Sequence, residues 1–250
     1  MTDAATRPLD AVLLAGGRAS RLDGASKPDL EVGGRTLLQH AVDAARSAGV
    51  RRIVVVGPSS LVAPGCLVVR ENPPFGGPVA AIAAGLAALD AASRPSGGAV
   101  DRSSNEPSQD LGIAAAASDV LVLACDLPAA GLAVARLLAH RADDESGAPR
   151  DGACLVDADG RTQWLTAVYA RAVLDRAFAA LDRPADGAAM RHLVASLDLV
   201  AIDDAGSAAD VDTWADLERA RAAHESAADH ARADAERGIA DHPIRPQEPR

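Results

Sequence analysis

Short runs of apolar residues alternate along this chain with longer stretches that are rich in alanine and leucine. The short runs are continuous and are not interrupted by polar residues, which is typical of strands that are buried on both faces of a sheet. The longer stretches place their apolar residues at helical intervals. This alternation predicts an α/β fold in which a mostly parallel, doubly wound sheet is covered by helices on both sides.

The predicted elements follow one another in the order that such a fold requires. Gly49 is placed to end the first helix, because glycine readily adopts the left-handed conformation past the last turn. Pro78 suits the first turn of the second helix, where its missing N–H costs nothing. Helices are expected at 36–48, 77–89, 129–141 and 212–237. Strands are expected at 11–15, 52–57, 66–70, 120–125, 153–158, 164–170 and 197–202.

Two segments interrupt this pattern. Residues from about 93 to 118 begin with a stretch rich in Ser, Pro and Gly, which predicts a flexible insertion. The tail after Gly238 contains three prolines and is expected to be disordered. We therefore predict a single domain over residues 8–220, followed by a C-terminal helical extension and a disordered tail over residues 221–250.

Composition excludes several classes of function. The chain has 25 Lys and Arg against 35 Asp and Glu, and a net charge of −10 argues against a general nucleic-acid or anionic-membrane binder. The three cysteines, Cys66, Cys125 and Cys154, form no C-x-x-C pair, so neither a zinc knuckle nor a disulfide framework is expected. The sequence shows no secretory signal and no membrane-spanning stretch, so the expected location is the cytoplasm.

The strongest functional signal follows the first predicted strand. Two glycines there let the backbone approach a ligand, and their N–H groups form a cradle for an anion. Three cations within ten residues supply the mobile charge that a triphosphate requires, although solvated basic residues beside a turn would look similar. Neither a Walker motif nor G-x-G-x-x-G is present. The segment contains Leu14, Ala15, Gly16, Gly17, Arg18, Arg21 and Lys27.

Two later segments fit the same chemistry. Gly76 and Gly77 precede Pro78 at a predicted helix start, where exposed N–H groups and the helix dipole favour an anion. Asp126 follows a central strand, at the edge of the sheet where α/β folds bind ligands. A carboxylate there can hold Mg²⁺ that bridges phosphates, while the alternative is that Asp126 caps the next helix.

The pattern LLAGGRASRL…SKPDL…GGRTLLQH resembles the N-terminal signature of the nucleotidyltransferases related to molybdenum cofactor guanylyltransferase. The resemblance implies that this loop wraps the phosphates of a nucleoside triphosphate. Arg21 and Lys27 match the arginine and lysine of the signature. Leu22 stands where a methionine is usual, and Ser26 where an acid often precedes the lysine.

Three further blocks carry the same resemblance. The glycines before Pro78 resemble a G-P-L-A-G-I block that closes over the nucleoside, with Asn72 or Glu71 as the acid or amide that contacts it. Asp126 matches the aspartate of a C-D-M-P block, which is a magnesium ligand in the family. The segment 209–217 resembles a block with a second acid that reaches the metal or the acceptor. Asp212 is the first choice and Asp210 the second, although Asp212 is equally suited to start the following helix.

The resemblance also suggests an acceptor side. Trp164 lies in a segment that lines the acceptor in the family and could flank a flat heterocycle, but a partly buried strand residue is the favoured interpretation. Arg191 lies in a segment like the family's acceptor-side helix, as a ligand for the acceptor phosphate or as a plain surface arginine.

Together these blocks imply a Rossmann-like α/β nucleotidyltransferase. An acceptor phosphate would attack the α-phosphorus of a nucleoside triphosphate, with Mg²⁺ held by Asp126 and Asp212, and with Arg21 and Lys27 neutralising charge. GTP and molybdopterin are the preferred substrates, and a molybdoenzyme or a cofactor-supply protein is a possible partner. A cytidylyltransferase or another cofactor guanylyltransferase is the alternative, and a non-catalytic nucleotide-binding protein is the alternative from a different class. The expected nucleotide-binding residues are Leu14, Ala15, Gly16, Gly17, Arg18, Lys27, Asn72, Gly77 and Pro78.

Overall fold

The computed structural model describes residues 7–16, 22, 25–94, 118–143 and 150–240. Three of the expected phosphate-loop residues, Gly17, Arg18 and Arg21, lie outside these ranges. Most of the predicted 93–118 insertion and the last ten residues of the predicted tail lie outside them as well.

The centre of the structure is a seven-stranded sheet with the order β5-β4-β1-β6-β8-β7-β9. Neighbouring strands are parallel except for β8, which runs antiparallel to both β6 and β7. A two-stranded antiparallel sheet is formed by β2 (Glu31–Val32) and β3 (Arg35–Thr36). The strands of the large sheet are β1 (Leu9–Leu14), β4 (Ile53–Val56), β5 (Leu67–Val69), β6 (Asp119–Ala124), β7 (Gly152–Val156), β8 (Thr162–Ala170) and β9 (Leu199–Asp203).

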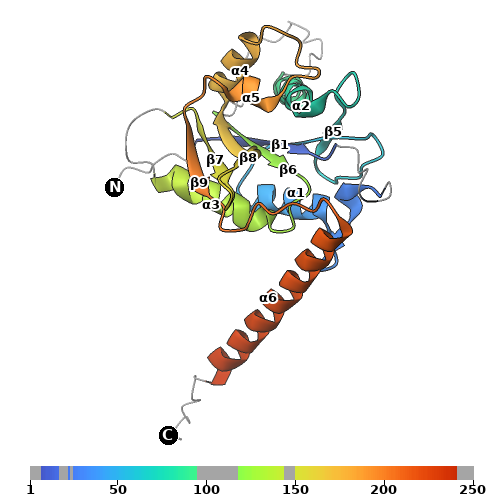
Figure 1. Ribbon diagram of the computed structural model, residues 1–250, viewed down its shortest axis with the longest axis vertical. Helices are drawn as coiled ribbons and strands as arrows, with labels where there is room; N and C mark the ends of the chain where they lie inside the picture. The colour runs from blue at the N-terminus through green and yellow to red at the C-terminus, as the bar shows by residue number, and fades with distance from the viewer. Residues whose placement is uncertain (1–6, 17–21, 23–24, 95–117, 144–149, 241–250) are drawn as a thin grey trace, which may run out of the picture.

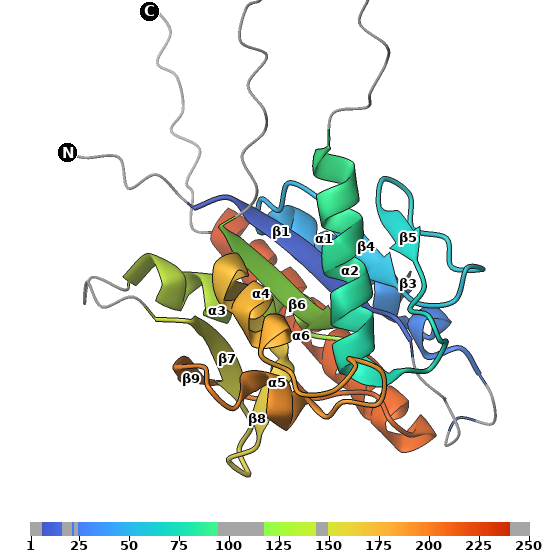
Figure 2. The ribbon, with the colours of Figure 1, turned by 90° about the horizontal axis from the view of Figure 1, so that it is seen from above.

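Helices cover both faces of the large sheet (Figures 1 and 2). Helices α1 and α3 lie against one face, while α2, α4 and α5 lie against the other. The mostly parallel, doubly wound fold that the sequence predicted is therefore confirmed. The helices are η1 (Lys27–Asp29, a 3-10 turn), α1 (Leu37–Ser47), α2 (Gly77–Ser93), α3 (Ala130–Asp143), α4 (Arg171–Ala179), α5 (Met190–Val194) and α6 (Trp214–Ala240).

Strand β1 shows why the apolar runs of this chain are continuous. Ala11 and Leu13 belong to the core under α1 and α3, whereas Val12 belongs to the core under α2. All three are fully buried. Since successive side chains of a strand point to opposite faces, a strand between two helical layers needs apolar residues at every position.

Local signals in the sequence explain where α1 begins and ends. Thr36 and Gln39 form a capping box, because the Thr36 hydroxyl accepts from the Gln39 N–H at 3.1 Å and the Gln39 side chain accepts from the Thr36 N–H at 2.9 Å. After the helix, Gly49 adopts a φ of 70°, the left-handed conformation expected of it.

Helix α2 packs closely on β1 because Gly85 has no side chain. A methyl group added at Gly85 would overlap the side chain of Val12. We expect Gly85→Ala to lower the free energy of unfolding, since overpacking costs about 1–3 kcal/mol and the better helix propensity of alanine returns only about 1 kcal/mol. Urea unfolding followed by circular dichroism measures the change.

The matched control is Gly131→Ala in α3, where an added methyl group has open space around it. That variant is expected to be neutral or slightly stabilised. An unchanged urea midpoint for Gly85→Ala would contradict the close packing of α2 on β1.

Helix α6 is anchored at its start and then extends away from the sheet (Figure 1). Leu217 of α6 and Val211 just before it pack with Val32 and Leu37 in a small separate core. The observed helix begins two residues later and ends three residues later than the predicted 212–237 segment. In the described part of the chain, no helix is both long and apolar enough to cross a membrane.

Candidate functional site

The candidate site lies where β1 and β6 end. The two strands are parallel neighbours, and Leu14 pairs with Ala124 at their carboxyl ends. After β1 the chain builds β4 and β5 on one side of it, and it then returns to place β6 on the other side. This change of direction leaves a crevice at the carboxyl edge of a doubly wound sheet, where ligands of such folds bind. The glycine loop after β1 and Asp126 after β6 both start from this edge.

Three carboxylates meet at this edge. Asp126, Asp210 and Asp212 each offer an oxygen atom, and these atoms all lie within 4.8 Å of one another. The segment that carries Asp210 and Asp212 is tied to β6 by the Val211 N–H, which donates to the Asp126 carbonyl at 3.0 Å. Oxygen donors of this kind suit hard divalent cations such as Mg²⁺ and Mn²⁺, so the donor set fits the predicted metal.

Lys27 lies among these carboxylates. Its Nζ is 3.2 Å from Oδ2 of Asp126 and also forms an ion pair with Oδ1 of Asp212. Burial by itself would lower the pKa of Lys27, but the hydrogen bonds and charges of Asp212 and Asp126 outweigh it and raise that pKa. Lys27 is therefore a fully charged ammonium group at neutral pH, held between two segments that are 99 and 185 residues away in the sequence.

Asp210 lies close to charges of its own sign, whereas Lys27 lies close to charges of the opposite sign. Desolvation, followed by the negative charges of Asp126 and Asp212, raises the pKa of Asp210 above its ordinary value. Crowding of like charge at this position is what a site for a cation requires, because a cation would relieve the repulsion.

The helix start at α6 uses Asp216 rather than Asp212 as its capping acid. Oδ2 of Asp216 accepts from the Thr213 N–H at 2.7 Å and from the Asp212 N–H at 3.1 Å, and the Thr213 hydroxyl accepts from the Asp216 N–H at 3.2 Å. The carboxylate of Asp212 is turned toward Lys27 instead. The carboxylate of Asp126 likewise faces Lys27, and α3 begins four residues after it, at Ala130.

A cavity of about 320 Å³ lies on the β1 side of Asp126. Four of the expected nucleotide-binding residues line it: Leu14, Gly16, Gly77 and Pro78. Ala15, which lies between Leu14 and Gly16, is buried, and its N–H already donates to the Val56 carbonyl at 2.9 Å. That N–H is thus part of the sheet and is not available to a phosphate.

Glu71 and Asn72, which the sequence left as alternatives, are placed differently with respect to this cavity. The side chain of Glu71 lines the cavity and is 9% exposed, and its Oε1 accepts from the Phe75 N–H at 3.0 Å. Asn72 is exposed and precedes a cis peptide bond to Pro73. Of the two residues, Glu71 is therefore the one that lines this cavity.

A second cavity, of about 250 Å³, lies on the other side of Asp126. Trp164 and its strand neighbours Gln163 and Thr166 line it, together with Met190 from α5 and Asp210. Arg191, the expected acceptor ligand, is exposed, and α5 contributes Met190 to the lining instead. Asp126, Ala124 and Leu165 line both cavities, so the two share one wall.

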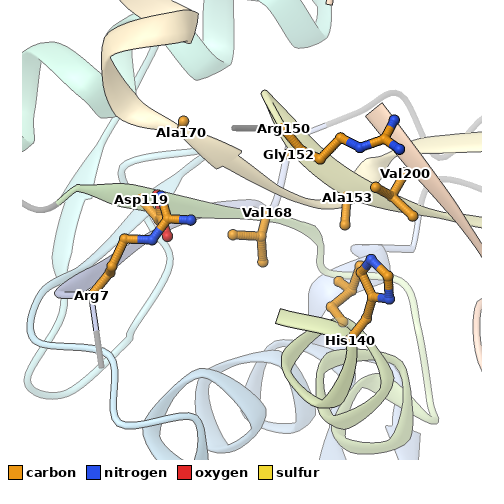
Figure 3. A pocket seen from close by; sticks show the side chains of 10 residues that line it. Arg7, Asp119, His140, Arg150, Gly152, Ala153, Val168, Ala170 and Val200 are labelled. Carbon is orange, nitrogen blue, oxygen red and sulfur yellow. The ribbon is translucent and has the colours of Figure 1, made fainter. Parts of the chain in front are cut away.

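Two other hollows are present in the described part of the chain, and the larger one shares Asp210 with the second cavity. A small one of about 50 Å³ is found at the start of β6, where Arg7 lies 3.7 Å from Asp119, with His140 and Arg150 in its lining (Figure 3). Asp119 and Asp126 bracket β6 at its opposite ends, so this hollow is about 20 Å from the carboxylates. A broader groove of about 650 Å³ runs beside α6 and includes Leu132 and His224.

Comparison with known proteins points to one family. The family profile described as "MobA-like NTP transferase domain" matches residues 11–200 of this chain. A molybdenum cofactor guanylyltransferase of Bradyrhizobium sp. (strain ORS 278) is 40% identical over 91 residues, which are 34% of this chain and 42% of that protein. The chain thus spans less than half the length of this curated relative.

Solved structures with similar folds include two mycobacterial ones. A homologue, from Mycobacterium sp. strain JC1, of the Mycobacterium tuberculosis protein Rv0371c is 22% identical, with a TM-score of 0.58 over 87% of this chain and 97% of that one. Rv0371c of M. tuberculosis H37Rv in complex with manganese is 20% identical, with a TM-score of 0.52 over 86% of this chain and 98% of that one. At these identities, the two structures bear on the fold alone.

Proposed function

This chain belongs to the MobA-like NTP transferase family, and from that premise we propose that it transfers a nucleoside monophosphate from a nucleoside triphosphate to a phosphorylated acceptor. In this reaction an oxygen of the acceptor phosphate forms a bond to the α-phosphorus. The bond between that phosphorus and the pyrophosphate oxygen breaks, and pyrophosphate leaves. The observation that carries the proposal is the pair of cavities that share Asp126 as a wall.

On this proposal, each of the two cavities holds one of the two substrates. We assign the nucleotide to the cavity lined by Gly16 and Gly77, because backbone next to glycine can approach phosphates closely. The acceptor takes the cavity lined by Trp164, whose half-buried indole gives a flat apolar surface. The reacting phosphates then meet at Asp126, where attacking and leaving groups can be aligned.

Catalysis requires no protein nucleophile, because the acceptor phosphate is itself one. Cys125, the thiol next to Asp126, is buried, and burial raises its pKa, so it packs as an apolar side chain. Lys27 supplies the positive charge that the β- and γ-phosphates need as charge develops on pyrophosphate. We give Arg21 the same role by its place in the signature.

We further propose that Asp126, Asp212 and Asp210 hold a divalent cation, with Mg²⁺ as the first candidate. The three oxygen donors within 4.8 Å of one another support this assignment. Held by these three carboxylates, such a cation would supply positive charge that offsets the charge of the phosphates. The manganese complex of the similarly folded M. tuberculosis protein makes Mn²⁺ a suitable probe.

GTP and molybdopterin are our proposed substrates, because the curated relative is a molybdenum cofactor guanylyltransferase. In the nucleotide cavity, the carboxylate of Glu71 can accept hydrogen bonds from the two adjacent N–H groups on the edge of a guanine. On this proposal, the protein that supplies molybdopterin or the enzyme that receives the product is the expected partner.

Thermal unfolding with Mg²⁺ and each of GTP, CTP, ATP and UTP tests the nucleotide. A ligand at a hundred times its Kd stabilises by about 2.7 kcal/mol, so we expect GTP to raise the Tm by about 5–10 °C. A selective shift with CTP would favour a cytidylyltransferase instead. Nucleotide binding without pyrophosphate release, for every acceptor supplied, would favour a non-catalytic nucleotide-binding protein.

A further inference from the structure

Lys27 is paired in a way that its proposed role does not require. A lysine that serves only the phosphates of a nucleotide would extend into the nucleotide cavity. The Nζ of Lys27 is instead paired with Asp126 and Asp212, which are two of the three carboxylates proposed to hold the cation. In this structure the ammonium group thus neutralises part of the negative charge of the carboxylate cluster.

We propose that Lys27 takes the place of the divalent cation in the nucleotide-free protein, so that the cation binds tightly only when a triphosphate draws Lys27 away. This inference rests on the proposed function, because it assumes that Asp126 and Asp212 hold the cation and that Lys27 binds phosphate. It adds an order of binding, in which the nucleotide binds before the cation. The metal site becomes available through the arrival of the nucleotide.

Partial burial makes this exchange costly without nucleotide. The side chain of Lys27 is 22% exposed and that of Asp126 is 25% exposed, so their attraction is screened less than that of a surface pair. A cation that enters alone must break both ion pairs and leave the ammonium group without a partner. Phosphate oxygens offer Lys27 charge-assisted hydrogen bonds of equal quality, and the flexible lysine side chain can move between the two sets of partners.

Thermodynamic linkage then makes the effect reciprocal. If the nucleotide raises the affinity for the cation, the cation raises the affinity for the nucleotide by the same factor. Because a cation also binds phosphates directly, this coupling alone would not identify Lys27. The distinguishing consequence is seen without nucleotide, where removal of the lysine charge should raise the affinity of the carboxylates for the cation.

The test measures Mn²⁺ binding to the nucleotide-free full-length chain, with unbound Mn²⁺ counted by electron paramagnetic resonance. We expect Lys27→Met to bind Mn²⁺ at least about tenfold more tightly than the wild type, within the usual range of such couplings. Lys27→Arg keeps the charge and should stay close to the wild type. Arg219→Met removes a nearby cation that pairs with Asp216 rather than with the cluster, and it should also stay close to the wild type.

The proposal is overturned if Lys27→Met binds Mn²⁺ no more tightly than the wild type, or if Arg219→Met gives an equal gain. Circular dichroism confirms that each variant folds, and Lys27→Gln replaces Lys27→Met if the latter does not. Failure of the proposed function would look different. In that case the wild type would bind no nucleoside triphosphate and release no pyrophosphate, whatever the Mn²⁺ titration shows.

Discussion

Asp126→Asn is expected to fold like the wild type and to lose about 10²–10³-fold in turnover, the usual cost of removing one preorganised electrostatic group from a reacting centre. Asp126 is the one acidic residue, among the described residues, that lines both of the cavities proposed for the nucleotide and the acceptor. Asparagine keeps the shape of the side chain but removes its charge. The charge is what holds Lys27 in this structure and what would hold a divalent cation.

Initial rates of pyrophosphate release, measured with the nucleotide that the thermal series selects, provide the test. Asp182→Asn is the matched control, because Asp182 is an exposed aspartate whose ion pair with Arg183 lies on the surface. The control should keep wild-type rates. A variant Asp126→Asn that kept more than a tenth of the wild-type kcat would remove Asp126 from the proposed chemistry.

The sheet could be predicted from the sequence because its central strands obey a simple physical rule. A strand covered on both faces must be apolar throughout, and this describes the runs that became β1, β4 and β6. The elements to which this rule does not apply, β2, β3 and α4, were not predicted. The two-residue strands β2 and β3 are too short to show any periodicity. Helix α4 follows β8 directly, and its N-cap is Ala170, which provides no capping side chain.

The carboxylate cluster was only partly predictable. Asp210 and Asp212 are two residues apart, and in an extended segment such residues point to the same side, so the sequence could have indicated that both face one site. The pairing of Lys27 with Asp126 and Asp212 was not predictable, because it joins distant segments. The same is true of Glu71, whose burial depends on how the 71–76 loop turns back on itself.

Lys27→Met is expected to lower kcat by about a thousandfold, in the range that removal of one cation costs in phosphoryl transfer. If Lys27 binds the β- and γ-phosphates, its loss weakens the ground state too, so KM for the nucleotide should rise together with the fall in kcat. Lys27→Arg should recover part of the lost rate, because it restores the charge with a different geometry. Steady-state pyrophosphate release at varied nucleotide concentration gives both constants.

The same substitution is expected to act in opposite directions on two measurements, and this makes it informative. If Lys27 served only the fold, Lys27→Met would lower the Tm and weaken both Mn²⁺ binding and turnover. If Lys27 served only the phosphates, Lys27→Met would lower turnover and leave Mn²⁺ binding in the absence of nucleotide unchanged. Tighter Mn²⁺ binding together with slower turnover is expected only if the Lys27 ammonium group alternates between the carboxylates seen here and the phosphates of the nucleotide. Wild-type turnover in Lys27→Met would reject the phosphate role altogether.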